Sequence, residues 1–155
     1  MARARSAAHS RSKGGAAFTK LLLETFRLNG RFLVAGDRLT KGIGLTSARW
    51  QVLGTLRGSD TPLTVAQIAR NMGLQRQSVQ RTVDVMCAEG LLRMVDNPRH
   101  RRAKLVVLTP KGWTVLRKAT RLQIDWANEC AAGIDPAELE AAFATLHKLR
   151  QRLTG

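Results

Sequence analysis

The sequence predicts a mainly α-helical fold with a small β wing, meaning a hairpin that projects from a helical core. Apolar residues recur at helical spacing through most of the chain after residue 17. Helix-start signatures precede several of these stretches, for example at Thr64 and at Thr109-Pro110. Two short aliphatic runs, 91–95 and 104–108, flank a turn. The length of 155 residues suits one domain with a hydrophobic core.

The N-terminal part divides into a polar arm and a long helix. Residues 1–17 carry basic side chains among Ala, Ser and Gly and no acidic residue. We expect a flexible basic arm there, which either contacts a polyanion or remains a solvated tail. A helix is expected from Phe18, because apolar residues continue at helical spacing as far as Leu39. Gly42 and Gly44 then end this helix.

Two shorter helices are predicted next, over about 47–57 and from Val65 to about Met72. The turn residues of segment 58–62 separate them. The second helix begins at a capping box, in which the Thr64 hydroxyl accepts from the Gln67 backbone amide while the Gln67 side chain reaches back. Gly73 follows this helix in a position suited to a left-handed backbone.

A helix over about 76–88 has two contrasting faces. Its inward stripe is apolar and consists of Val79, Val83, Met86 and Cys87. Its outward face offers amide, hydroxyl and guanidinium groups. Gly90 stops the helix, and the predicted hairpin that follows carries the basic run 99–102 at its tip. A polar helix followed by a cationic hairpin indicates a winged helix-turn-helix.

The last two predicted helices are long compared with this winged core. One has Thr109 as its cap and extends to about Cys130, and the other begins at the capping signature of Asp135. Together with the first helix, they carry more apolar surface than the core can cover. Segments 18–44 and 110–155 therefore form a symmetric dimer, or they fold back as a monomer onto the winged region 45–109. We expect the dimer.

The charge of the chain indicates a polyanionic partner. Lys and Arg number 26 against 11 Asp and Glu, which gives a net charge of +15. DNA is the commonest match for such a surplus, with a solubility surface or an anionic lipid binder as alternatives. A membrane span needs roughly 18 consecutive apolar residues, and the sequence has no such run. The basic N-terminus also lacks the apolar segment of a secretory signal, so a cytoplasmic location is expected.

Enzymatic and metal chemistry find little support in the sequence. Cys87 and Cys130 lie far apart, and the three histidines are scattered, which argues against a zinc site and a disulfide framework. There is no phosphate-binding Gly loop and no convincing Ser/His/Asp constellation. We expect no cofactor, no metal and no enzymatic activity.

The polar helix face and the hairpin tip form the predicted DNA-binding surface. A helix with Gln and Arg fits the major groove, where Gln80 suits a bidentate contact with adenine. Side chains near the helix N-terminus suit phosphate. Arginines at the wing tip suit a narrow, A·T-rich minor groove. The predicted contacts are Gln75, Arg76, Gln77, Ser78, Gln80, Arg81, Arg99, Arg101 and Arg102.

Over roughly residues 18–153 the chain resembles the MarR family of bacterial transcription regulators. The motifs that carry the resemblance are 66–69, 96–103 and Leu108-Thr109-Pro110-Lys111-Gly112. Arg102, seven positions before Thr109, matches the family arginine that enters the minor groove. His100 stands where the family has Asp. The resemblance implies a single domain over 18–155, in which the terminal helices form the homodimer and a small phenolic, aromatic or oxidising effector releases the DNA.

Asp84 and a possible effector pocket complete the site predictions. Asp84 either pairs with a wing arginine or offsets repulsion among the neighbouring cations, and the resemblance favours the first role. An effector pocket between the lobes and the dimer helices is expected from four residues, although such side chains also suit an ordinary core. They are Phe32, Arg49, Trp50 and Trp113.

The sequence thus predicts a dimeric, sequence-specific DNA-binding repressor of transcription that acts at a palindromic operator. The alternative is a non-specific architectural DNA-binding protein, which the net charge and the basic arm would also suit. Cys87 is expected to be an inert packed thiol, and Cys130 lies near a helix end, where a thiol can be exposed.

Overall fold

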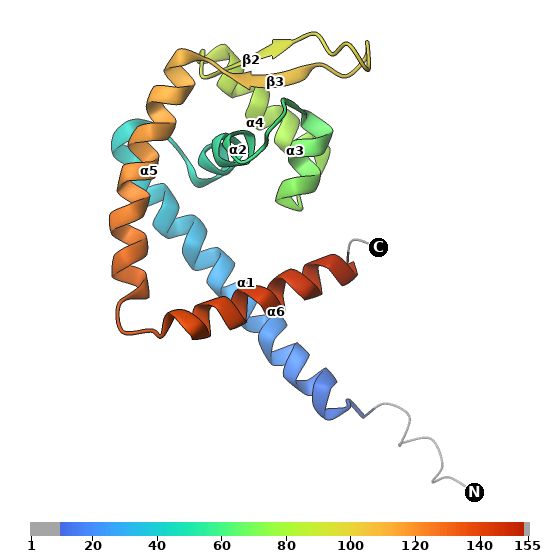
Figure 1. Cartoon of the computed structure of the whole chain (residues 1–155), viewed down its shortest axis with the longest axis vertical. Coiled ribbons are helices and arrows are strands. Elements are labelled where there is room, and N and C mark those ends of the chain that lie inside the picture. The colour runs from blue at the N-terminus through green and yellow to red at the C-terminus, as the bar shows by residue number, and fades with distance from the viewer. Residues whose placement is uncertain (1–9, 154–155) are drawn as a thin grey trace, which may run out of the picture.

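The computed structural model describes residues 10–153 and confirms the mainly helical fold with a small β wing (Figure 1). The predicted helices and both hairpin strands are present, with boundaries that differ from the expected ones by a few residues. The elements are α1 (Lys13–Thr40), the short 3₁₀ helix η2 (Lys41–Ile43), α2 (Ser47–Arg57), β1 (Leu63–Thr64), α3 (Val65–Met72), α4 (Arg76–Ala88), β2 (Leu92–Val95), β3 (Leu105–Leu108), α5 (Pro110–Ala131) and α6 (Pro136–Leu153).

Helix α1 begins at Lys13, earlier than the expected start at Phe18. The reason is a cap: the Ser12 hydroxyl oxygen accepts from the Gly15 backbone N–H at 3.0 Å. Only residues 10–17 of the predicted basic arm are described, and most of them belong to this helix, while residues 1–9 lie outside the described residues. At the other end, Gly44 has φ 69°, a left-handed conformation that glycine adopts without strain.

Strand β1 was not predicted, and it adds a third strand to the hairpin. The sheet is antiparallel with the order β1-β3-β2. Leu63 pairs with Val106, and Thr64 pairs with Leu105. A strand of two residues is too short to show an alternating pattern in the sequence. Strand β1 nevertheless connects the sheet of the wing directly to the start of α3. The capping box predicted at Thr64 is present there.

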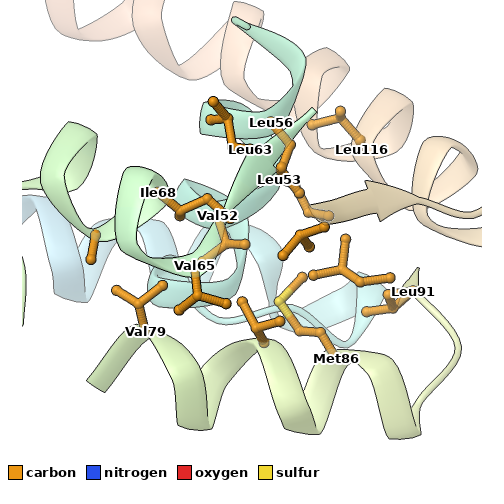
Figure 2. Packing of buried hydrophobic residues seen from close by; sticks show 14 of the residues in the cluster. Val52, Leu53, Leu56, Leu63, Val65, Ile68, Val79, Met86, Leu91 and Leu116 are labelled. Atoms are coloured by element: carbon orange, nitrogen blue, oxygen red, sulfur yellow. The ribbon is translucent and has the colours of Figure 1, made fainter. Parts of the chain in front are cut away.

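The hydrophobic core lies between helices α2, α3 and α4 and the sheet, and Figure 2 shows its packing. Leu53, Ile68, Met86 and Val106 are completely buried, and they come from α2, α3, α4 and β3. Leu116 adds a contribution from α5. Burying a side chain of this size contributes about 1.5–3 kcal/mol each. The core therefore fixes α4 firmly against the two preceding helices.

Much of the long helices lies outside this core. Figure 1 shows α1 projecting from the winged region as a rod. Among the described residues, α6 has none that is buried, and α1 has only Gly36 and Thr40. Large apolar side chains on these helices are exposed instead, for example Phe26 at 65% and Phe143 at 64%.

Helix α1 is joined to α2 by contacts of Ser47. The Ser47 hydroxyl donates to the Leu33 carbonyl at 2.7 Å, and its backbone N–H donates to Asp37 Oδ1 at 2.6 Å. Gly36 allows this close approach, because a Cβ there would overlap the Ser47 hydroxyl. These contacts leave little room for α1 to move relative to α2.

Helix α5 is joined to the end of the α4–β2 connection in a comparable way. Thr109 caps α5, and its hydroxyl also donates to the Gly90 carbonyl at 2.7 Å. Its backbone N–H donates to the Leu91 carbonyl at 3.1 Å. Gly112 packs against that carbonyl so closely that a Cβ would overlap the Leu91 oxygen. The start of α5 is therefore fixed to the segment that follows α4.

Candidate nucleic-acid interface

Helices α3 and α4 form a helix-turn-helix with a short connection. Gly73 ends α3 with φ 66°, and the Leu74 backbone N–H donates to the Ala69 carbonyl at 2.9 Å. Gln75 has an extended backbone and precedes the first residue of α4. The tight turn sets the direction in which α4 leaves α3.

The polar face of α4 is exposed, as the sequence pattern predicted. Val79, Val83 and Met86 are buried on the inward side. Gln75, Arg76, Gln77, Ser78 and Arg81 are exposed, and Gln80 is half-buried. Four of these side chains, from two successive turns of the helix, line one shallow hollow of about 540 Å³: Arg76, Gln77, Gln80 and Arg81.

Asp84 lies on the same face and contacts Gln80. Its Oδ1 atom accepts a hydrogen bond from Gln80 Nε2 at 2.8 Å. The expected pairing with a wing arginine is not present: the ion pairs in residues 10–153 are Arg27–Glu24 and Arg49–Glu89. Gln80 stands one turn earlier on the same helix, at the i, i+4 spacing that brings side chains together.

The wing tip is an exposed cationic turn between β2 and β3. Arg99, Arg101 and Arg102 are all exposed there. Asn97 shapes the turn, because its Nδ2 donates to the Ala103 carbonyl at 2.9 Å and its Oδ1 accepts from the Arg99 backbone N–H at 3.0 Å. The run Asp96-Asn97-Pro98 predicted a bend between the two strands, but it did not predict these two hydrogen bonds.

The structure does not bring the four expected effector-pocket residues together. Arg49 pairs in bidentate fashion with Glu89 at 2.9 and 2.8 Å, beside the C-terminus of α4. Trp50 packs against the hydrophobic core. Phe32 makes an edge-on contact with Trp126, with ring centroids 6.1 Å apart. An ion pair and two separate packing sites therefore hold these side chains.

Trp113 lines a different hollow, beside α5 and the end of α2. This hollow measures about 410 Å³ and includes none of the other three expected residues. Its lining combines apolar surface with three guanidinium groups, and one of them, Arg57, donates to the Thr120 hydroxyl at 3.1 Å. The full lining is Arg57, Trp113, Leu116, Arg117, Thr120 and Arg121.

The described residues can also be compared with the requirements of a metal site, a membrane span and a reactive thiol. In residues 10–153 there is no group of three or more His, Cys, Asp or Glu that would hold a metal ion. Across the same residues, no helix is long and apolar enough to cross a membrane. Cys130 is exposed and Cys87 is half-buried. Burial, and secondarily the negative charge of Asp84, raise the pKa of the Cys87 thiol.

Comparison with known proteins places this arrangement in a family. Residues 43–103 match the MarR family model. The chain is 38% identical over 130 residues to the uncharacterized protein Rv2011c of Mycobacterium tuberculosis, covering 84% of this chain and 90% of that protein.

Two solved structures with a similar fold are regulators of transcription. The transcriptional regulator PA3341 is 28% identical with a TM-score of 0.75, covering 88% of this chain and 98% of that chain. The M. tuberculosis transcriptional regulator MosR, solved in complex with DNA, is 26% identical with a TM-score of 0.71, covering 85% and 96%. With its helix-turn-helix and cationic wing, the chain belongs to the MarR family of DNA-binding transcription regulators.

Proposed function

We propose that this protein is a dimeric, sequence-specific repressor of transcription that binds a palindromic operator and leaves it when a small effector binds. The observation that carries the proposal is the division of α4 into a buried apolar face and an exposed face of Gln and Arg. The buried face fixes the helix, so the exposed face meets DNA with a defined orientation. MosR, a similar protein, has been solved in complex with DNA.

In this proposal α4 lies in the major groove. The helix has 13 residues and is about 20 Å long, and with a diameter of about 10–12 Å it fits a groove about 12 Å wide. Gln80 contacts adenine, and Arg76 or Arg81 contacts guanine or a phosphate. Gln75 and Ser78 lie at the helix N-terminus, where the partial positive charge favours a phosphate.

The wing arginines are proposed to enter the minor groove beside this contact. Arg102 is the main candidate, with Arg99 and Arg101 beside it, and all three are exposed. A narrow A·T-rich minor groove concentrates negative potential, which stabilises an inserted guanidinium group without a full base code. Region 45–109 then acts as the DNA-binding part of the domain.

Dimerisation is supported by the exposed apolar side chains on the long helices. Segments 18–44 and 110–155 are proposed to pair with a second copy. A stable dimer buries about 800 Å² of surface per partner, and the exposed apolar side chains on these helices would supply such an interface. Light scattering on the purified protein tests the assembly, and a monomer at micromolar concentration would contradict it. The exposed side chains include Phe18, Leu22, Phe26, Phe32, Ile124, Leu139 and Phe143.

The effector is proposed to be a small aromatic or phenolic anion, and the hollow beside Trp113 is its candidate site. Its volume of about 410 Å³ lies within the range of small-molecule pockets. Arg57, Arg117 and Arg121 supply positive charge, while Trp113 and Leu116 supply apolar surface. Salicylate is a suitable probe: it should weaken DNA binding by the wild type, and the Arg117→Ala variant should need a higher concentration.

Selection of DNA from a random pool, followed by footprinting, tests the proposed function. A bounded palindrome with half-sites about one helical turn apart supports a symmetric regulator. Even coverage of any DNA would support the architectural alternative, which the net charge of +15 also suits. In both cases affinity should fall with salt, with log K decreasing by about 0.9 per unit log salt for each neutralised phosphate.

A further inference from the structure

Asp84 places a negative charge on the surface that is proposed to face DNA. The chain has only 11 acidic residues against 26 basic ones, and Asp84 is exposed on the polar side of α4. Near DNA phosphates its negative charge lowers affinity. Within residues 10–153, its one side-chain hydrogen bond is the one from Gln80 Nε2, at 2.8 Å. The contact with Gln80 is therefore the interaction through which Asp84 can act on DNA binding.

The carboxylate decides which way the Gln80 amide points. A glutamine amide has a carbonyl oxygen at one end and an NH₂ group at the other, and the two ends are nearly equal in shape. An ionised carboxylate only accepts hydrogen bonds, so it selects the NH₂ end. One N–H of Gln80 is then occupied by Asp84. The other N–H and the Oε1 atom stay available to DNA.

This orientation matches one base better than the others. In the major groove adenine presents a donor at N6 and an acceptor at N7. The Oε1 atom accepts from N6 while the remaining N–H donates to N7, so every polar group of the Gln80 amide is satisfied. Guanine presents two acceptors, O6 and N7. An amide held by Asp84 would turn its own oxygen toward one of them, which leaves buried acceptors without a donor.

Nearby cations do not compete for Asp84 in this structure. The side chain of Arg81 folds along its own helix, where its Nε donates to the Gln77 carbonyl at 3.5 Å. Among the described residues, Asp84 forms no ion pair. Gln80 in turn lines the hollow with Arg76, Gln77 and Arg81, on the face that is exposed to a ligand.

We propose that Asp84 is a specificity-determining positioning residue, which holds the Gln80 amide so that it selects adenine and rejects guanine. The inference rests on the proposed function, since it assumes that α4 lies in the major groove. It adds a role that is independent of the wing.

The test compares Asp84→Ala and Asp84→Asn with the wild type on selected DNA. The base pair contacted by Gln80 is first identified as the one at which Gln80→Ala loses its preference. Affinity is then measured for the selected site and for a site with guanine in place of that adenine. We expect the wild type to prefer adenine by about tenfold or more. Asp84→Ala should reduce this ratio to within about twofold, while its affinity for random DNA stays equal or rises.

The Asn variant tests whether the acceptor-only character of the carboxylate is needed. Its amide can offer either an oxygen to Gln80 Nε2 or an NH₂ group to Gln80 Oε1, so its adenine preference should fall between those of the wild type and Asp84→Ala. Loss of the negative charge alone would change the affinities for the two sites by the same factor. An unchanged ratio in Asp84→Ala, or an undiminished ratio in Asp84→Asn, would therefore overturn the proposal. A wild type that selects no bounded site would instead overturn the proposed function together with this inference.

A second measurement needs no DNA. In a ¹⁵N–¹H spectrum of the unbound protein, the Gln80 side-chain amide protons should shift when Asp84 is replaced by Ala, because the hydrogen bond is lost. Unchanged Gln80 resonances in Asp84→Ala would show that the contact is absent in solution and would also overturn the proposal. Because Asp84 is exposed, both variants should fold, and circular dichroism confirms this.

Discussion

Replacing Gly112 with Ala should destabilise the protein, although Ala is the better helix former. A Cβ at this position would overlap the carbonyl oxygen of Leu91, which is backbone and has no side-chain freedom with which to move away. That oxygen also accepts from the backbone N–H and from the hydroxyl of Thr109, both at 3.1 Å. The substitution therefore disturbs packing and two hydrogen bonds at once.

The magnitude follows from these contacts. Overpacking at a buried site costs about 1–3 kcal/mol, and each disturbed hydrogen bond contributes about 1 kcal/mol. The higher helix propensity of Ala offsets about 1 kcal/mol of this loss in stability. The free energy of unfolding should therefore fall by roughly 2–4 kcal/mol. At about 2–4 °C per kcal/mol for a chain of this size, the Tm should fall by roughly 5–15 °C.

Gly54→Ala is the matched control. Gly54 lies within α2, and a Cβ there would meet nothing within 4 Å. The same chemical change should then stabilise the protein by about 0.5–1 kcal/mol. Thermal unfolding followed by circular dichroism, at one protein concentration for all variants, measures both effects. A Gly112→Ala variant that is as stable as Gly54→Ala would refute the close approach of α5 to Leu91.

The remaining predictions concern the core, the α2–α4 ion pair and the thiols. Met86→Ala should lower the free energy of unfolding by about 2–5 kcal/mol in a urea titration, since the side chain is completely buried. Glu89→Gln should cost only about 0.5–1 kcal/mol, because its pair with Arg49 is partly exposed, and the cost should shrink in high salt; a salt-independent cost would contradict this. Because its pKa is raised, the Cys87 thiol should stay protonated and react slowly with iodoacetamide at pH 8, with the rate rising only at higher pH. Mass spectrometry should therefore find Cys130 labelled before Cys87, and the reverse order would show that α4 opens readily.

The local signals in the sequence predicted the helices well. The capping box at Thr64 and the Thr109-Pro110 start marked real helix boundaries, because both use side chains close in sequence to satisfy backbone N–H groups. The start of α1 was placed too late, since the single Ser12 cap stands in a stretch of Gly and Ala with no apolar periodicity. Strand β1 depends on pairing with Val106, a residue distant in sequence, so local pattern could not reveal it.

The candidate site was predictable as a surface but not as a set of contacts. The spacing of Val79, Val83 and Met86 was enough to tell which side of α4 faces outward. It did not show that Asp84 contacts Gln80, because side chains four residues apart on a helix have several partners within reach. The scatter of the four effector-pocket residues had a different cause. Arg49 is drawn to Glu89, which is 40 positions away in the chain.

The junction between α1 and α2 affects how closely the spacing of the operator half-sites must match the spacing of the two recognition helices. Helix α1 has 28 residues and so extends about 42 Å, and it is fixed near its C-terminal end by Ser47. In the proposed dimer, a tilt of about 5° along such a lever displaces its far end by about 3.7 Å, close to the rise of about 3.4 Å between base pairs. Small changes in packing between the two subunits would therefore shift one recognition helix by a whole base-pair step relative to the other.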